Sequence, residues 1–184
     1  MTALRLGSEV WRSPATRWAA PVALALAVAT VVRLGLNANA FAWAVVQVVL
    51  VGVAAHDLVT RRIPNAVTVP GSAAALLLRL AFERSSLVEV AVAGLAAFAS
   101  FYLLALLARG GLGMGDVKLA GMLGFLLGRE VLPALFVGAL AGGVAAVVLA
   151  LRSSSGRRAT FAYGPYLAFG GAVAILVLSP PPLV

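Results

Sequence analysis

The sequence contains no cysteine, a single histidine (His56), a single lysine (Lys118) and only two aspartates (Asp57 and Asp116). The absence of cysteine excludes disulfide bonds, thiolate-bound zinc and cysteine nucleophiles. A zinc site built on imidazoles is not expected either, because only one imidazole is present. We therefore predict neither a bound metal nor a cofactor.

Charge is scarce as well. Charged residues make up 11% of the 184 residues and hydrophobic residues 62%, with a mean hydropathy of +1.06. A soluble domain carries about a quarter charged residues, so lipid must be the main solvent of this chain. Because about 20 apolar residues cross a bilayer core as a helix, we predict an all-α, polytopic membrane bundle of six to seven helices. The predicted spans are residues 18–36, 41–56, 67–82, 87–108, 117–128, 131–151 and 161–178.

The basic residues predict the orientation of these spans. The chain has 14 Arg and Lys against six Asp and Glu, for a net charge of +8. The basic residues occur in short clusters between apolar runs. This pattern argues against nucleic-acid binding and for contact with anionic lipid headgroups. With a cytoplasmic N-terminus, ten of the 14 fall on the cytoplasmic side, as the positive-inside rule requires. The other four are Arg33, Arg79, Arg84 and Arg129.

We expect a basic cytoplasmic lead-in at residues 1–17 and one transmembrane domain at residues 18–184. An alternative for the first span is a cleaved signal peptide, because a basic start, an apolar run and Ala38-Asn39-Ala40 are features of such peptides. The run is long for a signal peptide and carries Arg33 late, which favours a retained span.

Three local predictions concern helix ends and packing. Arg79 lies near the end of an apolar span, so its side chain is expected to extend outward to water. Asn65 or Thr68 is expected to cap the third span. Gly138 and Gly142 form a small-xxx-small pattern, which we interpret as ordinary close packing of two helices.

Asp57 and Asp116 each flank an apolar span, and the predicted orientation puts both at the cytoplasmic face. An acid at membrane depth is costly and is usually paired and functional, although each could simply mark a helix end. We favour a joint site, because basic residues and Gly or Pro lie beside both. Two close carboxylates tend to share one proton. One could then deprotonate a water while the other polarises a scissile carbonyl, which is peptide hydrolysis by general acid–base catalysis.

Glycine and proline beside the aspartates are expected to shape this site. Gly113 and Gly115 permit backbone torsions closed to other residues and leave room for an extended substrate beside Asp116. Pro64 prevents the helix that carries Asp57 from continuing, so a sharp turn is predicted at residues 60–65.

The neighbouring basic side chains have two interpretations. Arg61 and Arg62 could contact substrate, or could simply follow the positive-inside rule. Lys118 could act on the aspartates or bind lipid phosphate. His56 is interpreted as an interfacial polar residue and not as a catalytic base.

Three segments resemble the type IV prepilin peptidases. Residues 57–65, Asp-Leu-Val-Thr-Arg-Arg-Ile-Pro-Asn, resemble their first catalytic segment, and residues 113–119, Gly-Met-Gly-Asp-Val-Lys-Leu, resemble their Gly-x-Gly-Asp segment. Residues 163–168, Tyr-Gly-Pro-Tyr-Leu-Ala, are similar to a Phe-Gly-Pro-Phe-Leu-Ala stretch near their C-terminus, with Tyr163 and Ala162 replacing the usual Phe and Pro. The resemblance extends from about residue 42 to 178. It is strongest to the compact peptidases of Flp/Tad-type pili.

This resemblance implies a membrane aspartic endopeptidase of prokaryotic inner membranes, with Asp57 and Asp116 as the catalytic pair and Gly164 and Pro165 in a site-shaping segment. The implied partner is a prepilin-like precursor, in which a basic leader precedes an apolar helix, and the leader is removed at the cytoplasmic face. Larger members also carry a cysteine-bearing domain that N-methylates the product. That domain has no counterpart in this sequence, so we expect no methyltransferase activity.

Other functions stay open on the sequence alone. An ion- or proton-coupled transporter would also hold acids in the membrane, but near the midplane of repeated halves. Here the acids lie at span ends and no repeat is visible. A catalytically inactive scaffold of a secretion apparatus would keep the aspartates apart. Proteases of the signal-peptide-peptidase kind pair Gly-x-Gly-Asp with Tyr-Asp, whereas here His56 precedes Asp57.

Overall fold

The computed structural model describes residues 13, 16–107, 112–152, 162–178 and 180–184. Most of the predicted lead-in lies outside these ranges, as do the basic residues Arg109, Arg157 and Arg158. Within the described ranges there are seven α-helices, two short 3₁₀ helices and no strand. The α-helices are α2 (Ala19–Leu34), α3 (Ala38–Thr60), α4 (Asn65–Phe82), α5 (Leu87–Leu107), α6 (Met114–Leu127), α7 (Val131–Arg152) and α8 (Gly164–Val177), and the 3₁₀ helices are η2 (Arg84–Ser86) and η3 (Gly128–Glu130).

The predicted all-α membrane bundle is confirmed, and each of the seven predicted spans corresponds to one of these helices. Four helical stretches are long and apolar enough to cross a membrane, whereas α2 and α8 are apolar but shorter. The four are Ala38–Thr60, Asn65–Phe82, Arg84–Leu107 and Met114–Arg152, the last comprising α6, η3 and α7. The main difference in boundaries is that α3 continues to Thr60, so Asp57 lies inside its last turn.

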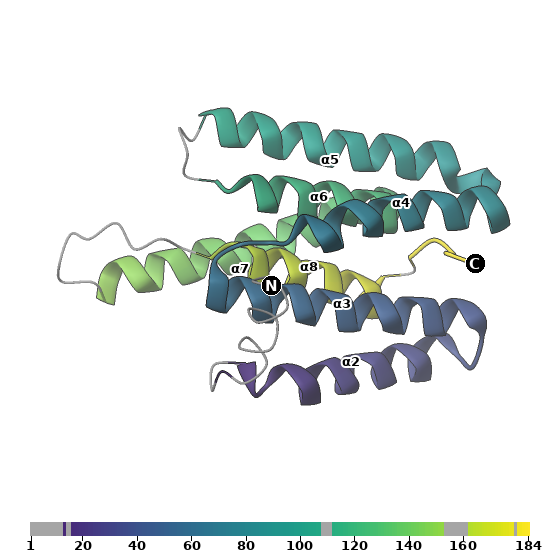
Figure 1. Ribbon diagram of the computed structural model, residues 1–184, viewed down its shortest axis with the longest axis horizontal. Helices are drawn as coiled ribbons and strands as arrows, with labels where there is room; N and C mark the ends of the chain where they lie inside the picture. Colours follow the sequence, from purple (N-terminus) through teal and green to yellow (C-terminus); the bar gives the residue numbers. More distant parts are fainter. Residues whose placement is uncertain (1–12, 14–15, 108–111, 153–161, 179) are drawn as a thin grey trace, which may run out of the picture.

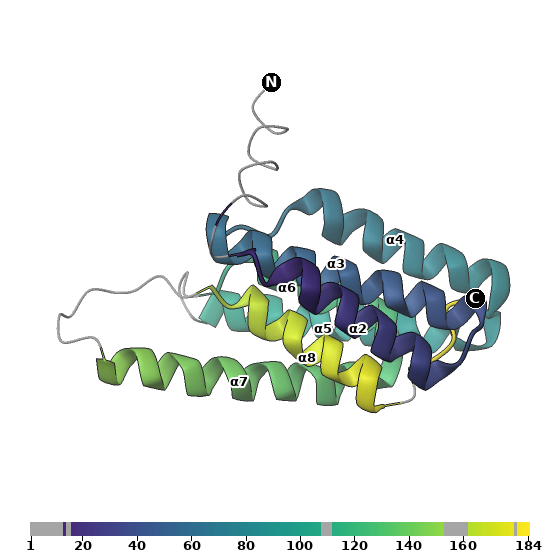
Figure 2. The same cartoon turned by 90° about the horizontal axis from the view of Figure 1, so that it is seen from below.

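Consecutive helices run antiparallel along one common direction (Figures 1 and 2). The main contacts are of α5 with α6, α7 with α8, α2 with α3, and α3 with α8. The two 14-residue helices α6 and α8 lie inside the bundle, and ten residues of α6 are buried. These two helices are largely covered by protein, so they need not match the thickness of the bilayer.

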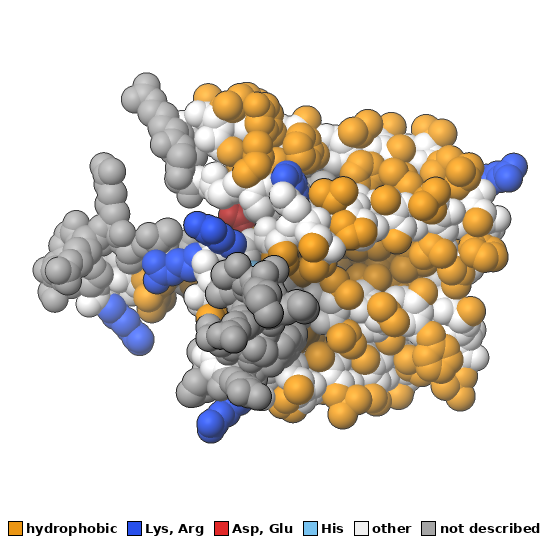
Figure 3. Space-filling model, in the orientation of Figure 1, with side chains coloured by type: hydrophobic (Ala, Val, Ile, Leu, Met, Phe, Trp, Pro, Cys, Tyr) orange, Lys and Arg blue, Asp and Glu red, His pale blue; other side chains and the backbone are white. Residues whose placement is uncertain are grey.

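Both aspartates lie toward the same end of the bundle, which we call the aspartate end. It holds the C-terminal ends of α3, α5 and α7 and the N-terminal ends of α6 and α8 (Figure 1). Basic side chains gather at this end around a small acidic patch, while apolar side chains cover most of the rest of the visible face (Figure 3).

Glycines allow the helices to approach each other closely. A Cβ built on Gly124 of α6 would lie 2.6 Å from the carbonyl oxygen of Ala93 in α5, and one on Gly138 of α7 would lie 2.8 Å from that of Tyr166 in α8. Gly142 would meet the Tyr163 ring at 2.6 Å. The prediction that Gly138 and Gly142 serve close helix packing is therefore confirmed.

The prediction that Arg79 extends outward to water is wrong. Its side chain is fully buried, with 0% exposure. The guanidinium donates to the carbonyl oxygens of Phe125 (3.0 Å) and Leu126 (2.7 Å), and also to Pro181 (3.4 Å). The last carbonyls of a helix have no partner within the helix, and Arg79 supplies donors for two of them at the C-terminus of α6.

A second arginine does the same for α8. Arg33, in the last turn of α2, donates to the carbonyl oxygens of Ile175 (3.0 Å), Val177 (2.9 Å) and Leu178 (2.6 Å). A positive charge also interacts favourably with the C-terminal end of the helix dipole. The C-terminal carbonyls of α6 therefore bind Arg79 of α4, and those of α8 bind Arg33 of α2.

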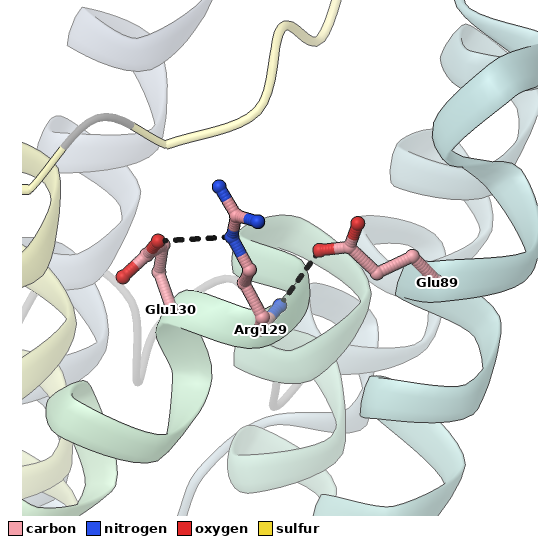
Figure 4. Close-up of polar contacts among 3 residues, drawn as sticks. All are labelled: Glu89, Arg129 and Glu130. Atoms are coloured by element: carbon pink, nitrogen blue, oxygen red, sulfur yellow. Dashed lines mark hydrogen bonds and ion pairs between the residues drawn. The ribbon is translucent and has the colours of Figure 1, made fainter.

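The chain reverses between α6 and α7 at the end opposite the aspartates. Gly128 has φ +58°, a conformation that favours glycine. Glu89 of α5 accepts a hydrogen bond from the backbone N–H of Arg129 at 3.1 Å, and the Arg129 side chain pairs with Glu130 at 3.3 Å (Figure 4). The carboxylate of Glu89 therefore fixes the turn that sends α7 back along the bundle.

Candidate active site

Asp57 lies in the last turn of α3 and is 5% exposed. The helix ends because Arg61 adopts a left-handed conformation, φ 53° and ψ 36°, in which its N–H donates to the carbonyl oxygen of Asp57 at 2.8 Å. Pro64 follows in an extended conformation before α4. The predicted turn after Asp57 is therefore confirmed, and it begins one helical turn beyond the carboxylate.

His56 fastens this turn. Its Nδ1 lies 2.8 Å from the carbonyl oxygen of Arg62 and 2.9 Å from the hydroxyl of Thr60. The Thr60 hydroxyl also donates to the carbonyl oxygen of His56 at 2.8 Å. Through these contacts the imidazole stabilises the turn.

Asp116 lies in the first turn of α6 and is 9% exposed. Gly113 is the N-cap residue, with extended torsions of φ −73° and ψ 144°, and its carbonyl oxygen accepts the N–H of Asp116 at 3.0 Å. A Cβ on Gly113 would lie 3.2 Å from Oδ2 of Asp116. A larger residue at 113 would therefore crowd this carboxylate.

The two aspartates line one cavity of about 280 Å³, which we call the aspartate cavity. The sequence separates them by an entire hairpin of α4 and α5, and the fold brings them together. Four of the other predicted site residues line the same cavity. The full lining is Asp57, Arg61, Arg62, Ile63, Gly113, Met114, Gly115 and Asp116.

Ile63 is the residue that the sequence reasoning missed. It is 8% exposed and lies against two glycines in the first turns of α6 and α8. A Cβ on Gly115 would lie 3.0 Å from Cβ of Ile63, and one on Gly164 would lie 2.9 Å from its Cδ1. The sequence signal for it was weak, because a single apolar residue in a turn can equally well be exposed.

Gly164 and Pro165 were predicted from the resemblance alone, and the two residues contact two different places. The N–H of Gly164 donates to Oδ2 of Asp57 at 3.2 Å, so α8 begins directly at the aspartate. Pro165 instead lines a different cavity, of about 220 Å³, against α2 and α3. Gly164, the first residue of α8, thus contacts the site, and Pro165 is the second residue of that helix.

Lys118 does not line the aspartate cavity. Its ammonium donates to Oδ1 of Asn65 at 2.9 Å and joins α6 to the start of α4. The predicted caps of α4 are wrong, because Pro64 is the N-cap residue and no side chain caps it. Asn65 is engaged by Lys118, and the Thr68 hydroxyl is buried with no hydrogen-bond partner among the described residues.

The electrostatic setting is two buried carboxylates. Neither forms an ion pair with a described residue, and the charge of Asp57 acts on Asp116 through space. Two such groups resist ionising together, which favours one proton shared between them. Nowhere in the described ranges do three His, Asp or Glu side chains gather as a metal site would require.

Comparison with known proteins identifies the family of this chain. The model of the type IV leader peptidase family matches residues 43–150, which include α3 from Trp43, both aspartates and most of α7. This chain belongs to the type IV leader peptidase family. The matched range ends before Gly164, so the contact of α8 with Asp57 comes from the structure and not from the family match. No solved structure matches the chain.

Curated relatives point to the same family. The chain is 33% identical over 135 residues to the prepilin leader peptidase/N-methyltransferase of Dickeya chrysanthemi, covering 70% of this chain and 48% of the relative. Proteins of the same name from Burkholderia pseudomallei (strain K96243) and Neisseria gonorrhoeae are 31% and 34% identical, over 44% and 43% of their own lengths. The chain thus spans a little under half the length of these relatives.

Proposed function

We propose that this protein is an aspartic endopeptidase that removes the leader from type IV prepilin-like precursors. The observation that carries the proposal is that Asp57 and Asp116, from helices far apart in sequence, line one small cavity at one end of the bundle. The family match and the prepilin peptidase relatives support the choice of substrate.

The reaction we propose needs one proton on the aspartate pair. The ionised carboxylate takes a proton from a water molecule, whose oxygen attacks the scissile carbonyl carbon. The protonated carboxyl donates a hydrogen bond to the carbonyl oxygen as negative charge develops there. When the tetrahedral intermediate collapses, the C–N bond breaks and the leaving amine takes up the proton. Neither a covalent enzyme intermediate nor a metal takes part.

Several residues would position this chemistry. The Gly164 N–H holds Oδ2 of Asp57, while the N-terminal end of α6 lies beside Asp116, where the helix dipole stabilises negative charge. Both effects favour an ionised carboxylate, and burial opposes the ionisation of both at once. Arg61 and Arg62 line the cavity and are candidates to contact the substrate backbone or the membrane surface.

We place the aspartate end at the cytoplasmic face of the inner membrane. The excess of basic residues predicted for that side supports this orientation. A basic leader would emerge from the membrane there, with the apolar helix of the precursor still in the bilayer, so the cleavage point would meet the aspartate cavity at the interface.

The test is co-expression with candidate prepilins, read by N-terminal sequencing of the product. Asp57→Asn and Asp116→Asn should each abolish processing while the protein accumulates in membranes. Glu83→Gln, at the opposite end of the bundle, is the matched control and should process normally. Processing by either aspartate variant would end the proposal, and Asp57-dependent ion uptake by reconstituted vesicles would favour the transporter instead.

The same product tests the expectation of no methyltransferase activity. Purified protein with precursor and a methyl donor should release a product whose new N-terminal amine is unmethylated. A mass increase of one methyl group on that residue would contradict the expectation.

A further inference from the structure

An apolar groove lies between α5 and α7, beside the aspartate cavity. It encloses about 500 Å³ and is lined mainly by apolar side chains. It forms because α5 packs mainly against α6 whereas α7 packs mainly against α8, so the two outer helices stand apart. Its lining includes Phe101, Leu104, Leu112, Phe136, Ala139 and Tyr163.

The groove faces the lipid side of the bundle. Leu104 is 51% exposed and Phe136 68% exposed, so its walls are accessible from the bilayer. Among the described residues that line it there is no Asp, Glu, Lys or Arg. A ligand that fits these walls is apolar and enters sideways from the membrane.

The groove is continuous with the catalytic residues on two sides. Leu112 precedes Gly113, which lies against the carboxylate of Asp116. Tyr163 precedes Gly164, whose N–H binds the carboxylate of Asp57. Two residues of the groove wall are thus chain neighbours of the two glycines that contact the aspartate carboxylates.

The α7 wall is suited to a helix. Ala139 lines the groove, and Gly143 lies one turn nearer the aspartate end, where a built Cβ meets no atom within 4 Å. Small residues four apart allow the backbone of another helix to approach closely. Gly138 and Gly142, on the neighbouring face, are already used against α8. The Ala139–Gly143 pair is thus left uncovered on the groove side.

We propose that this groove binds the apolar helix that follows the cleavage point of the precursor, an inference that rests on the proposed function. The described walls of the groove are apolar and uncharged, so the groove suits the helix and not the basic leader. The leader would lie over the aspartate cavity on the water side of the membrane, while the helix stays in the bilayer. A lipid acyl chain is the other apolar occupant, and the experiments below separate the two.

The first experiment fills the groove. Ala139→Trp should reduce the rate of precursor processing roughly tenfold or more, because the added ring occupies the space of the incoming helix. The control is Leu140→Trp, at the same depth but outside the groove lining and 59% exposed. It should process at the wild-type rate. If Ala139→Trp and Leu140→Trp process the precursor at equal rates while the wild-type protein processes it normally, the groove proposal is wrong. The proposed function would be unaffected by that result.

The second experiment does not depend on how well the tryptophan variant folds. The chain contains no cysteine, so Ala139→Cys or Leu104→Cys introduces a unique thiol into the inactive Asp116→Asn protein. Oxidation in isolated membranes should link it to a cysteine in the first turns of the precursor helix, whereas Leu140→Cys should link much less. Equal linking, or none from either groove position, overturns the proposal. A wild-type protein that leaves every precursor uncut overturns the proposed function itself.

Discussion

The backbone N–H of Gly164 donates to Oδ2 of Asp57 over 3.2 Å, although 107 residues separate them in the sequence. This bond ties the first residue of α8 to the last turn of α3. A Cβ at position 164 would lie 2.7 Å from the same oxygen and 2.9 Å from Cδ1 of Ile63. Glycine is needed here because the carboxylate and the backbone are in direct contact, with no space for a side chain.

Gly164→Ala is therefore expected to push the Asp57 carboxylate out of place. Precursor processing should fall at least roughly tenfold, because a small displacement of a catalytic group is costly, while the protein still accumulates. The measurement is the processing rate in membranes at equal protein level. Ser86→Ala in η2, at the opposite end of the bundle, is the control and should process normally. Wild-type rates for Gly164→Ala would show that this contact does not position the carboxylate.

His56 provides a second prediction, because its Nδ1 contacts the carbonyl oxygen of Arg62 and the hydroxyl of Thr60. His56→Ala should loosen the turn at 61–64 and lower processing, since Arg61 and Arg62 line the aspartate cavity. His56→Asn offers an amide donor to the same carbonyl and should retain most of the activity. The measurement is the rate of precursor processing by His56→Asn relative to that by His56→Ala. If both variants are equally inactive, the imidazole takes part in the chemistry.

Arg79 leads to a prediction about stability, because its guanidinium supplies the donors for two carbonyls at the end of α6. Arg79→Leu removes the donors for Phe125 and Leu126 and leaves their carbonyls buried, at a cost of about 1–3 kcal/mol for each unsatisfied group. The loss of a buried charge offsets part of this cost. We expect a lower thermal midpoint in detergent and loss of activity through disorder of α6. Arg84→Leu, on an exposed side chain, is the control and should change the midpoint little. A midpoint for Arg79→Leu equal to the control would contradict this role.

The orientation can be tested with single cysteines, because the native chain has none. Arg152→Cys lies at the C-terminal end of α7, on the aspartate side, and Arg84→Cys lies at the other end of the bundle. A membrane-impermeant thiol reagent added to intact cells should label Arg84→Cys only. In inside-out vesicles it should label Arg152→Cys only. The reverse pattern would place the aspartate cavity on the outer face of the membrane.

The helical spans could be predicted from the sequence because they depend on local composition. A run of about 20 apolar residues folds as a helix in lipid whatever its neighbours are, and each of the seven predicted runs has its helix. The turn after Asp57 was likewise predictable, because Pro64 restricts the residue before it, although α3 itself ends earlier, at the left-handed Arg61. Both aspartates were candidates for a similar reason, since an acid stands out in a chain with 11% charged residues.

What the tertiary structure decided is which groups touch. Arg79 was expected to reach water, because an arginine in an apolar span usually does. Its actual partners are carbonyl groups at the end of α6, whose position depends on how α4 and α6 pack. Lys118 binds Asn65 instead of an aspartate, and Ile63 joins Gly115 to Gly164, for the same reason. Composition and spacing determine local structure within one segment. These contacts join different segments, so they form only when the other helices have packed around α6 and α8.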